Sequence, residues 1–268
     1  MKKEVLIIIP AYNEEQTIAT VLRDLNEGHI TDFADILVMN DASKDNTNYI
    51  VKKENCKLVT HVFNLGYGAA VQLGYKYAVR RGYRYVIQMD ADGQHDVTNI
   101  PRILEALKTK DEDGRYPDIV VGSRYLDGSG FYHTSGIKKL AIFMFRRIIK
   151  RVTGQRITDP TSGLQGFSFP AFLYYSKYGN FDDRYPDANM IMQMILLKFK
   201  VKEIPADMHE REYGKSMHNG LMPFVYMCWL FLSMLGIYVR IKVLKIDEGI
   251  GEKNVVWETK RENYTTEI

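Results

Sequence analysis

Short apolar runs that alternate with segments of helical periodicity limit the possible folds of this chain more than any other feature. Five such runs are predicted to be strands: residues 5–9, 35–39, 57–62, 84–89 and 118–122. The helices predicted between them cover residues 17–25, a segment ending at 51, a segment ending at 80, and residues 97–107. Strands that alternate with helices are typical of an α/β fold with a doubly wound, mostly parallel sheet and helices on both faces.

Polar residues follow three of these strands at the point where each strand ends. Residues 10–15 follow the first strand, a polar cluster at 40–47 follows the second, and Asp90, Asp92 and Gln94 follow the fourth. Ligands of open α/β sheets bind beyond the carboxyl ends of the strands. We therefore expect these loops to meet at one edge of the sheet and to form the functional site.

The side chains of Asp90, Asp92 and Gln94 offer only oxygen ligands of the kind that Mg²⁺ or Mn²⁺ prefers over zinc. A divalent ion bound there can hold a diphosphate and neutralise charge on a leaving group. Asp-Gly is also a common turn sequence, so an ordinary strand-to-loop turn is the alternative for this stretch taken alone.

The composition narrows the class of protein. A chain of 268 residues with 46% hydrophobic residues predicts one large domain, or one domain with an appendage. A net charge of +3 is too small to indicate a nucleic-acid partner. Cys56 and Cys228 form no metal-ligand pattern and fit a reducing compartment. Because the first apolar run is short and Pro10 follows it, we interpret it as a strand and not as a signal peptide.

The second half of the chain is less regular. Residues 136–152 predict a basic amphipathic helix, which can lie on an anionic membrane surface or pack with its charged face in solvent. A turn at residues 158–163 precedes an apolar run at 164–169. Residues 187–199 predict a helix and residues 201–208 a final strand.

Residues 221–239 form a stretch of 19 residues without a charge, which is long enough to span a membrane. Three cations follow it: Arg240, Lys242 and Lys245. If the preceding domain is cytoplasmic, a single span would place these cations outside, against the usual charge bias. We therefore favour an interfacial or re-entrant helix, or a helical hairpin-like partner surface, with a buried soluble helix as the alternative.

These patterns predict three parts of the chain. Residues 1–220 are expected to form the main α/β domain, residues 221–246 an apolar membrane-associated or interface helix, and residues 247–268 a polar, poorly ordered tail.

Three stretches, taken together and in order, resemble a known family. They are Pro10-Ala-Tyr12-Asn13-Glu14, Asn40-Asp41-Ala-Ser43-Lys-Asp45 and Asp90-Ala-Asp92, with further matches at residues 122–125, 161–163 and 211–218. The chain resembles the family 2 inverting glycosyltransferases of GT-A fold over residues 4–220, and among them the dolichyl- or polyprenyl-phosphate sugar transferases. Residues 214–218 depart from the ending typical of the dolichol enzymes.

The resemblance implies roles for individual residues at the donor site. Asp41 would accept a hydrogen bond from the base, and Arg124 would pair with phosphate, where its planar fork has an advantage over lysine; a surface ion pair is the alternative for Arg124. The residues implied in nucleotide-sugar binding are Pro10, Tyr12, Glu14, Asp41, Asn64, Gly66, Gly68, Asp90, Ala91, Asp92, Lys215 and Ser216. Metal would be held by Asp90, Asp92 and Gln94, and Arg211 would help close a loop over the diphosphate. His218 is either a further member of that loop or a structural residue.

The resemblance also implies a catalytic base and an acceptor site. Inverting transfer to a hydroxyl needs a carboxylate opposite the leaving diphosphate, whereas a lipid phosphate is already an anion. Asp159 and Asp187 are the candidate bases, and either can instead begin a helix or hold a structural partner. Lys138 and Lys139 would bind the acceptor.

The expected function is the metal-dependent, inverting transfer of a sugar from a nucleoside diphosphate, with UDP favoured, to polyprenyl phosphate at the cytoplasmic face of the cell membrane. A growing cell-surface polysaccharide is the alternative acceptor, and a non-catalytic nucleotide-sugar sensor or scaffold is a third reading. A small membrane-protein partner or a second copy of the chain could complete the assembly. No G-x-G-x-x-G follows the first strand, which argues against a dinucleotide-dependent dehydrogenase.

Overall fold

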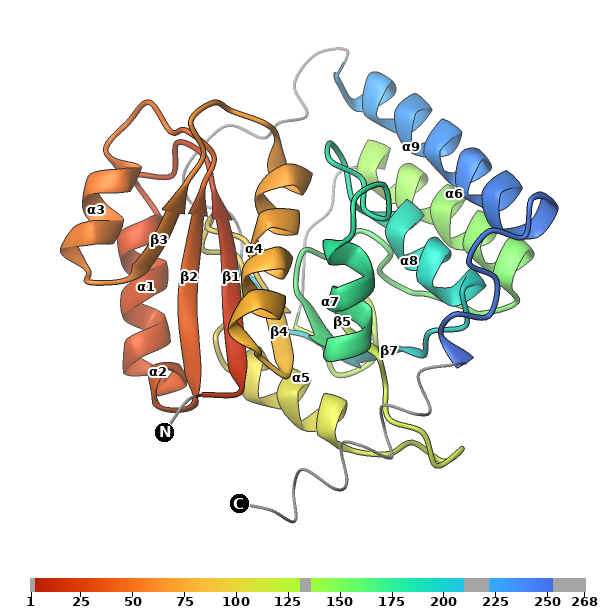
Figure 1. Ribbon diagram of the computed structural model, residues 1–268, viewed down its shortest axis with the longest axis horizontal. Helices are drawn as coiled ribbons and strands as arrows, with labels where there is room; N and C mark the ends of the chain where they lie inside the picture. The colour runs from red at the N-terminus through yellow and green to blue at the C-terminus, as the bar shows by residue number, and fades with distance from the viewer. Residues whose placement is uncertain (1–2, 131–135, 210–221, 253–268) are drawn as a thin grey trace.

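The computed structural model describes residues 3–130, 136–209 and 222–252, without the side chains of 137, 138 and 222–224. Its centre is a seven-stranded sheet in the order β3-β2-β1-β4-β6-β5-β7 (Figure 1). The strands are β1 (Val5–Ala11), β2 (Ala34–Asn40), β3 (Lys57–Thr60), β4 (Tyr85–Gln88), β5 (Ile119–Ser123), β6 (Gln165–Ser168) and β7 (Val201–Pro205). The predicted doubly wound, mostly parallel sheet is confirmed, with strand ends that differ by a few residues.

Helices cover both faces of the sheet (Figure 1). They are α1 (Ile18–Glu27), α2 (Ile30–Phe33), α3 (Thr47–Lys53), α4 (Tyr67–Arg81), α5 (Asn99–Lys108), α6 (Gly136–Thr153), α7 (Phe169–Ser176), α8 (Ala188–Leu196) and α9 (Met222–Tyr238), followed by the π-helix η1 (Val239–Val243). Strand β1 is buried over its whole length, and its side chains alternate between two cores. Leu6 and Ile8 pack with α4, α6, α7, α8 and α9, whereas Val5, Ile7 and Ile9 pack with α1, α3 and α5.

Strand β6 is antiparallel to both of its neighbours, β4 and β5. Its first residue, Gln165, lies opposite Gln88 at the end of β4. The loop before β6 therefore reaches the same edge of the sheet as the loops after the parallel strands. The sequence analysis did not predict where the strand in residues 164–169 ends. In the structure the chain passes directly from β6 into α7, and Pro170 lies in the first turn of that helix, where proline is tolerated.

Helix α9 packs along α8, and α6 lies beside them on the same face of the sheet (Figure 1). Leu230 and Met234 face the core, whereas Phe231, Leu232 and Leu235 are more than half exposed, at 52%, 62% and 51%. Residues 225–243 are long and apolar enough to cross a membrane by length and composition. Helix α9 is therefore only partly buried within this chain.

The chain after η1 turns back onto the domain. The side chain of Asp247 accepts hydrogen bonds from Arg240 and Tyr174, and the backbone N–H of Gly251 donates to the carbonyl of Leu197 at 2.9 Å. Residues 247–252, the start of the expected tail, thus pack against the domain, and residues 253–268 lie outside the described residues.

Candidate active site

The loops after β1 and β2 are joined by hydrogen bonds from backbone N–H groups to side chains. The N–H of Asn13 donates to Ser43 Oγ at 3.0 Å, and that of Lys44 donates to Asn13 Oδ1 at 2.8 Å. The N–H of Glu14 donates to Thr47 Oγ1 at 2.9 Å. Tyr12 stays 41% exposed above this joined pair of loops, where an aromatic ring can stack on a base. Pro10 is buried inside β1, in register with Met39 of β2, so its contribution is to the strand.

Asp41 is buried at the end of β2 and organises the loop after β3. Its carboxylate accepts hydrogen bonds from the N–H groups of Leu65 at 2.9 Å and Gly66 at 2.8 Å. His61 Nδ1 donates to the same carboxylate at 2.7 Å, and Asn64 donates from its side chain to the carbonyl of Asp41. The residue expected to contact the base therefore also fixes the backbone of the predicted nucleotide loop.

Gly66 and Gly68 have no side chains, so another group can come close to their backbone. In this structure that group is a segment of the protein itself, at Asp182 and Asp183. A side chain at Gly68 would place its Cβ 2.2 Å from the carbonyl oxygen of Asp182. The N–H of Ala69 donates to the carbonyl of Asp183 at 3.1 Å. The start of α4 thus holds the segment that leads into α8, in addition to any nucleotide it meets.

Asp90 lies just beyond β4 and is held from two sides. Tyr67 donates its hydroxyl to Asp90 Oδ1 at 2.9 Å, and His95 Nε2 donates to Oδ2 at 3.3 Å. Burial acts to raise the pKa of Asp90, but the hydrogen bond and charge of His95, the Tyr67 hydroxyl and the charge of Arg124 together lower it. The carboxylate is therefore ionised at neutral pH, as a metal ligand must be.

A buried chain of hydrogen bonds supports Tyr67 from behind. Tyr75 donates to Gln88 Oε1 at 2.7 Å, and Gln88 Nε2 donates to the Tyr67 oxygen at 2.8 Å. Burial and the neighbouring charge of Asp90 raise the pKa of Tyr67 well above its usual value. The phenol keeps its proton, so it remains a donor to Asp90 and fixes the direction of that carboxylate.

Gly163, in the loop before β6, leaves room for the Asp90 carboxylate. A Cβ at this position would lie 2.2 Å from Asp90 Oδ2. The antiparallel strand β6 therefore contributes to the site by bringing a residue without a side chain against the acidic group.

We expect Gly163→Ala to displace Asp90 and to lower turnover by about 100-fold, the effect of a misplacement of about 1 Å at a reacting centre. The measurement is nucleoside diphosphate release, with circular dichroism as the check on the fold. Gly236→Ala is the matched control, because nothing lies within 4 Å of a Cβ built there. Equal activity of the two variants would contradict the role given to Gly163.

Asp92 and Gln94 lie in the turn after Asp90. Asp92 Oδ1 accepts the N–H of Gln94 at 3.1 Å, and Gln94 Nε2 donates to the carbonyl of His209 at 3.3 Å. Within the described ranges, no three His, Cys, Asp or Glu side chains form a metal-binding group. Two carboxylates with few other protein ligands suit Mg²⁺ or Mn²⁺, because such ions in nucleotide enzymes take their remaining ligands from phosphates and water.

Arg124, just after β5, forms a two-pronged ion pair with Asp159. Its Nε lies 2.7 Å from Asp159 Oδ2 and its Nη2 lies 2.8 Å from Oδ1. Asp159 is 0% exposed, and Arg124 also donates to Thr161. Glu203 of β7 accepts the N–H groups of Thr158 and Asp159 and holds this loop in place. Both oxygens of the Asp159 carboxylate are thus engaged in holding Arg124.

Asp187, at the start of α8, accepts a hydrogen bond from Tyr226 of α9 at 2.5 Å. Burial, with the negative charges of Asp90 and Asp159, raises the pKa of Asp187 to about 6, against the lowering effects of Tyr226 and Arg124. These electrostatic interactions place Asp187 in the same site as Asp90, Arg124 and Asp159. A carboxylate with a pKa near 6 is suited to accept a proton at neutral pH.

Several predicted residues are not part of this description. Arg211, Lys215, Ser216 and His218 lie outside the described residues, as does the side chain of Lys138. Lys139 is exposed at the start of α6. The sequence reasoning missed Tyr67, His95 and Tyr226. Only His95 carried a local signal, a titratable side chain in the loop that begins at Asp90.

Comparisons with known proteins identify the family of the chain. The sequence model described as glycosyl transferase family 2 matches residues 6–175. An undecaprenyl-phosphate mannosyltransferase of Micrococcus luteus is 27% identical over 222 residues, 81% of this chain and 88% of that protein. A UDP-N-acetylglucosamine–dolichyl-phosphate N-acetylglucosaminyltransferase of Methanococcus voltae is 31% identical over 192 residues, 65% of this chain and 73% of that protein.

Among solved structures, glucosyl-3-phosphoglycerate synthase of Mycobacterium tuberculosis, in complex with Mn²⁺, UDP and glucosyl-3-phosphoglycerate, has the same fold. It superposes with a TM-score of 0.67 at 16% identity, covering 88% of this chain and 80% of that one. The chain therefore belongs to glycosyltransferase family 2, and it has the GT-A fold that its motifs predicted.

Proposed function

We propose that this glycosyltransferase transfers a sugar from a UDP-sugar to polyprenyl phosphate, with inversion and with a divalent metal ion, in cell-envelope glycan synthesis. The observation that carries the proposal is the single site in which an ionised Asp90, the Arg124 ion pair and Asp187 meet. The names of two relatives, which act on undecaprenyl phosphate and on dolichyl phosphate, support the acceptor class. The UDP named in one relative and in the solved structure supports the donor.

The donor side of the proposal uses the loops after β1, β2 and β4. The exposed Tyr12 ring and the loop held by Asp41 would bind the base and ribose, and Asp90 and Asp92 would hold Mg²⁺ or Mn²⁺. The metal would neutralise the departing diphosphate. Arg124, kept in place by Asp159, would stabilise the same developing charge with a fixed guanidinium.

The acceptor side uses Asp187 in one of two ways. With a hydroxyl acceptor, Asp187 would take the proton as general base. With a phosphate acceptor no proton needs to be removed, and Asp187 would orient the acceptor while Lys138 and Lys139 bind it. The choice between these roles depends on the acceptor, which the experiment below identifies.

The raised pKa of Asp187 has a consequence for stability. The folded protein binds this proton more tightly than the unfolded chain does, so the contribution of Asp187 to stability is fully present below about pH 4 and is lost as pH rises toward 6. We expect Asp187→Asn to remove this pH-dependent decrease in the free energy of unfolding. One pKa unit corresponds to about 1.4 kcal/mol, so the decrease is at most about 3 kcal/mol. Urea unfolding of both proteins between pH 4 and 7, in buffer with a chelator, measures it. Parallel curves for the two proteins would contradict the raised pKa.

We further propose that α9 lies on the cytoplasmic face of the membrane, with its exposed apolar side in the bilayer. Replacing Leu232 and Leu235 together by Gln should release most of the protein from membranes, because both side chains are more than half exposed and polar groups are costly to place in lipid. Membrane flotation is the measurement. The control is Val62→Gln, because Val62 is an apolar residue that is 84% exposed and lies in the loop after β3, outside α9. Retention of the double variant on membranes would argue that this side of α9 contacts protein instead.

Purified protein, Mn²⁺ and a panel of radiolabelled nucleotide sugars, each with and without undecaprenyl phosphate, test the whole proposal. Label in the organic phase with one donor fixes the donor and the acceptor class together. Label that stays in water, with nucleoside diphosphate released, would point to a polysaccharide acceptor. Nucleotide binding without turnover would favour the sensor reading.

A further inference from the structure

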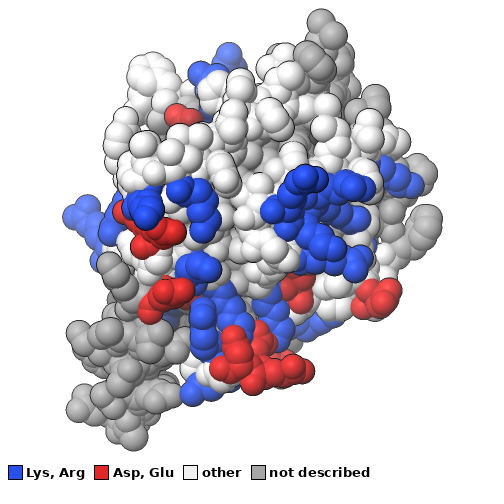
Figure 2. Space-filling model, turned by 90° about the vertical axis from the view of Figure 1, so that its right-hand side faces the viewer, with Lys and Arg blue, Asp and Glu red and all other residues white. Residues whose placement is uncertain are grey.

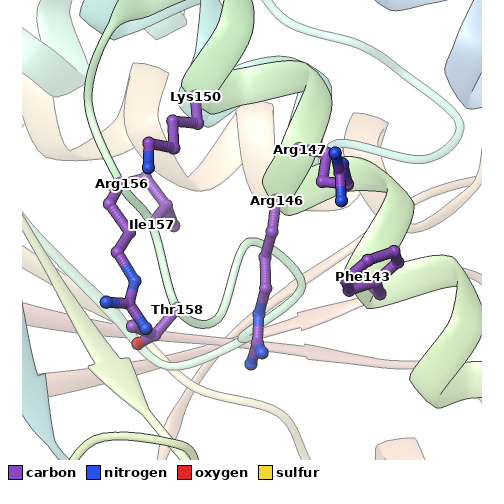
Figure 3. Close-up of a pocket in the computed structure, with 7 residues that line it drawn as sticks. All are labelled: Phe143, Arg146, Arg147, Lys150, Arg156, Ile157 and Thr158. Atoms are coloured by element: carbon purple, nitrogen blue, oxygen red, sulfur yellow. The ribbon is translucent and has the colours of Figure 1, made fainter.

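Helix α8 begins directly after Asp187 and packs against both α6 and α9. Lys and Arg side chains gather in patches on this side of the molecule (Figure 2). Arg146, Arg147 and Lys150 of α6 line one pocket together with Arg156 of the following loop (Figure 3). The segment before α8 contacts the start of α4, next to the predicted nucleotide loop. Helix α8 thus borders both the cationic helix α6 and the donor side, so contacts with more than one element must set the position of Asp187.

Asn189, in the first turn of α8, is completely buried and uses every hydrogen-bonding position of its side-chain amide. Its Oδ1 accepts the backbone N–H groups of Asp187 and Met190, each at 2.9 Å. Its Nδ2 donates to Asp182 Oδ2 at 2.8 Å and to Ser233 Oγ of α9 at 2.9 Å. Aspartate at this position could not donate, and leucine could neither donate nor accept, so this set of contacts requires an amide.

Asp182 joins the Asn189 amide to α9 and to its own segment. Its Oδ2 also accepts the hydroxyl of Ser233 at 3.3 Å. Its Oδ1 accepts the backbone N–H groups of Arg184 and Tyr185 at 2.9 Å and 3.1 Å. Side chains therefore hold the segment 182–189 at both of its ends. A polar network whose members are all hydrogen-bonded rigidifies the chain and specifies one arrangement.

The backbone of the same segment is attached to the start of α4. The N–H of Ala69 donates to the carbonyl of Asp183 at 3.1 Å. Gly68 leaves room for the carbonyl oxygen of Asp182, which would lie 2.2 Å from a Cβ at that position. The two carbonyl groups that meet α4 and the amide that holds the backbone of Asp187 thus belong to one hydrogen-bonded unit.

We propose that Asn189 is a positioning residue, which holds the Asp187 carboxylate at a fixed place relative to α4 and α9. The inference rests on the proposed function in one respect, that Asp187 acts on the acceptor. Asn189 itself acts through Asp187 and has no direct role toward either substrate. Its contribution differs from that of Tyr226, since Tyr226 donates to the carboxylate whereas Asn189 fixes the backbone that carries it.

Steady-state kinetics of the full-length protein separate positioning from binding. Asn189→Leu keeps the approximate size of the side chain and removes all of its hydrogen bonds. We expect kcat to fall by about 100-fold, the effect of a displacement of about 1 Å at a reacting centre. The affinity for UDP with Mn²⁺, measured by calorimetry, should change by less than about threefold, as for sites that share no partners. The reason is that Asp41 holds Leu65 and Gly66 of the nucleotide loop independently of this network.

Variants of Ser233 give a milder test from the side of α9. Ser233→Ala removes one hydroxyl of the network and should lower kcat by about fivefold, the scale of one neutral hydrogen bond. Ser233→Thr keeps the hydroxyl and should retain kcat to within about twofold. Ser176→Ala is the matched control on α7, where the hydroxyl donates to the carbonyl of Leu173 at 2.8 Å, and it should leave kcat unchanged. Thermal unfolding checks each fold; should Asn189→Leu not fold, Ser233→Ala carries the test.

Residue-resolved amide hydrogen exchange tests the network without any turnover. In Asn189→Leu the N–H groups of Asp187 and Ala69 should both exchange about tenfold faster, because one local opening exposes them together. The N–H groups of Leu65 and Gly66 are the internal control, since they are held from the end of β2, and their exchange should change less than about twofold. Faster exchange at Asp187 alone, or at neither position, would overturn the connection to α4.

The kinetic outcomes separate this inference from the proposed function. Unchanged kcat in Asn189→Leu, or an equal loss of kcat and of UDP affinity, would overturn the positioning role. Absence of turnover in the unmodified protein with every donor would instead overturn the proposed function, and the exchange measurement would then decide the network by itself.

Discussion

Asp92→Asn should lower metal-dependent turnover by about three orders of magnitude, the scale of the several kcal/mol that a bound cation contributes to charge stabilisation. The fold should survive, because an asparagine oxygen can still accept the N–H of Gln94 that Asp92 accepts now. What is lost is the negative charge that would attract the ion. The measurement is nucleoside diphosphate release across a Mn²⁺ titration.

Asp32→Asn is the charge-matched control for this prediction. Asp32 is a surface residue whose side chain is 71% exposed, in the short helix α2. It should keep the activity and metal response of the unmodified protein. Wild-type turnover in Asp92→Asn at saturating Mn²⁺ would remove Asp92 from the metal site.

Asp159→Asn should lower the free energy of unfolding by about 3–5 kcal/mol, the range for removing one partner of a buried ion pair. Asp159 is fully buried, and both of its oxygens accept from Arg124. Asparagine would leave the guanidinium without a counter-charge and would turn a donor toward it. Urea unfolding at neutral pH measures the change.

The double variant Arg124→Met with Asp159→Leu separates stability from function. It removes both charges, so most of the lost stability should return, as it does when buried pairs are replaced by apolar groups. Turnover should not return, because the guanidinium that we propose stabilises the leaving diphosphate is gone. Full activity in the double variant would show that the pair serves the fold alone.

The parallel half of the fold could be predicted from the sequence because its signals are local. Each strand from β1 to β5 is a short apolar run, and each is followed by turn or helix residues within a few positions. Strand β6 could not be predicted in this way. Its pairing with β4 joins Gln165 to Gln88, far apart in the sequence. The short segment 164–169, in which Gln165 and Ser168 interrupt the apolar side chains, does not distinguish strand from helix.

The acidic residues of the candidate site could be predicted from the sequence, but most of the side chains that hydrogen-bond to them could not. Asp90 and Arg124 stand at strand ends, where the motif and the topology agree. Tyr67 and Tyr226 look like core aromatics in the sequence, and only the folded chain shows that their hydroxyls reach Asp90 and Asp187. The pairing of Arg124 with Asp159 likewise depends on the antiparallel turn before β6.

The hydrogen bond from Tyr226 to Asp187 joins α9, whose apolar side faces outward, to the carboxylate that we propose acts on the acceptor. A shift of α9 by even one ångström would reach that carboxylate directly, without passing through the sheet. With α9 on the membrane as proposed, the bilayer would act as an activator as well as the place where the enzyme resides. The donor sugar would then be protected from hydrolysis while the protein is away from the membrane, and transfer would be confined to the surface where the proposed lipid acceptor is found.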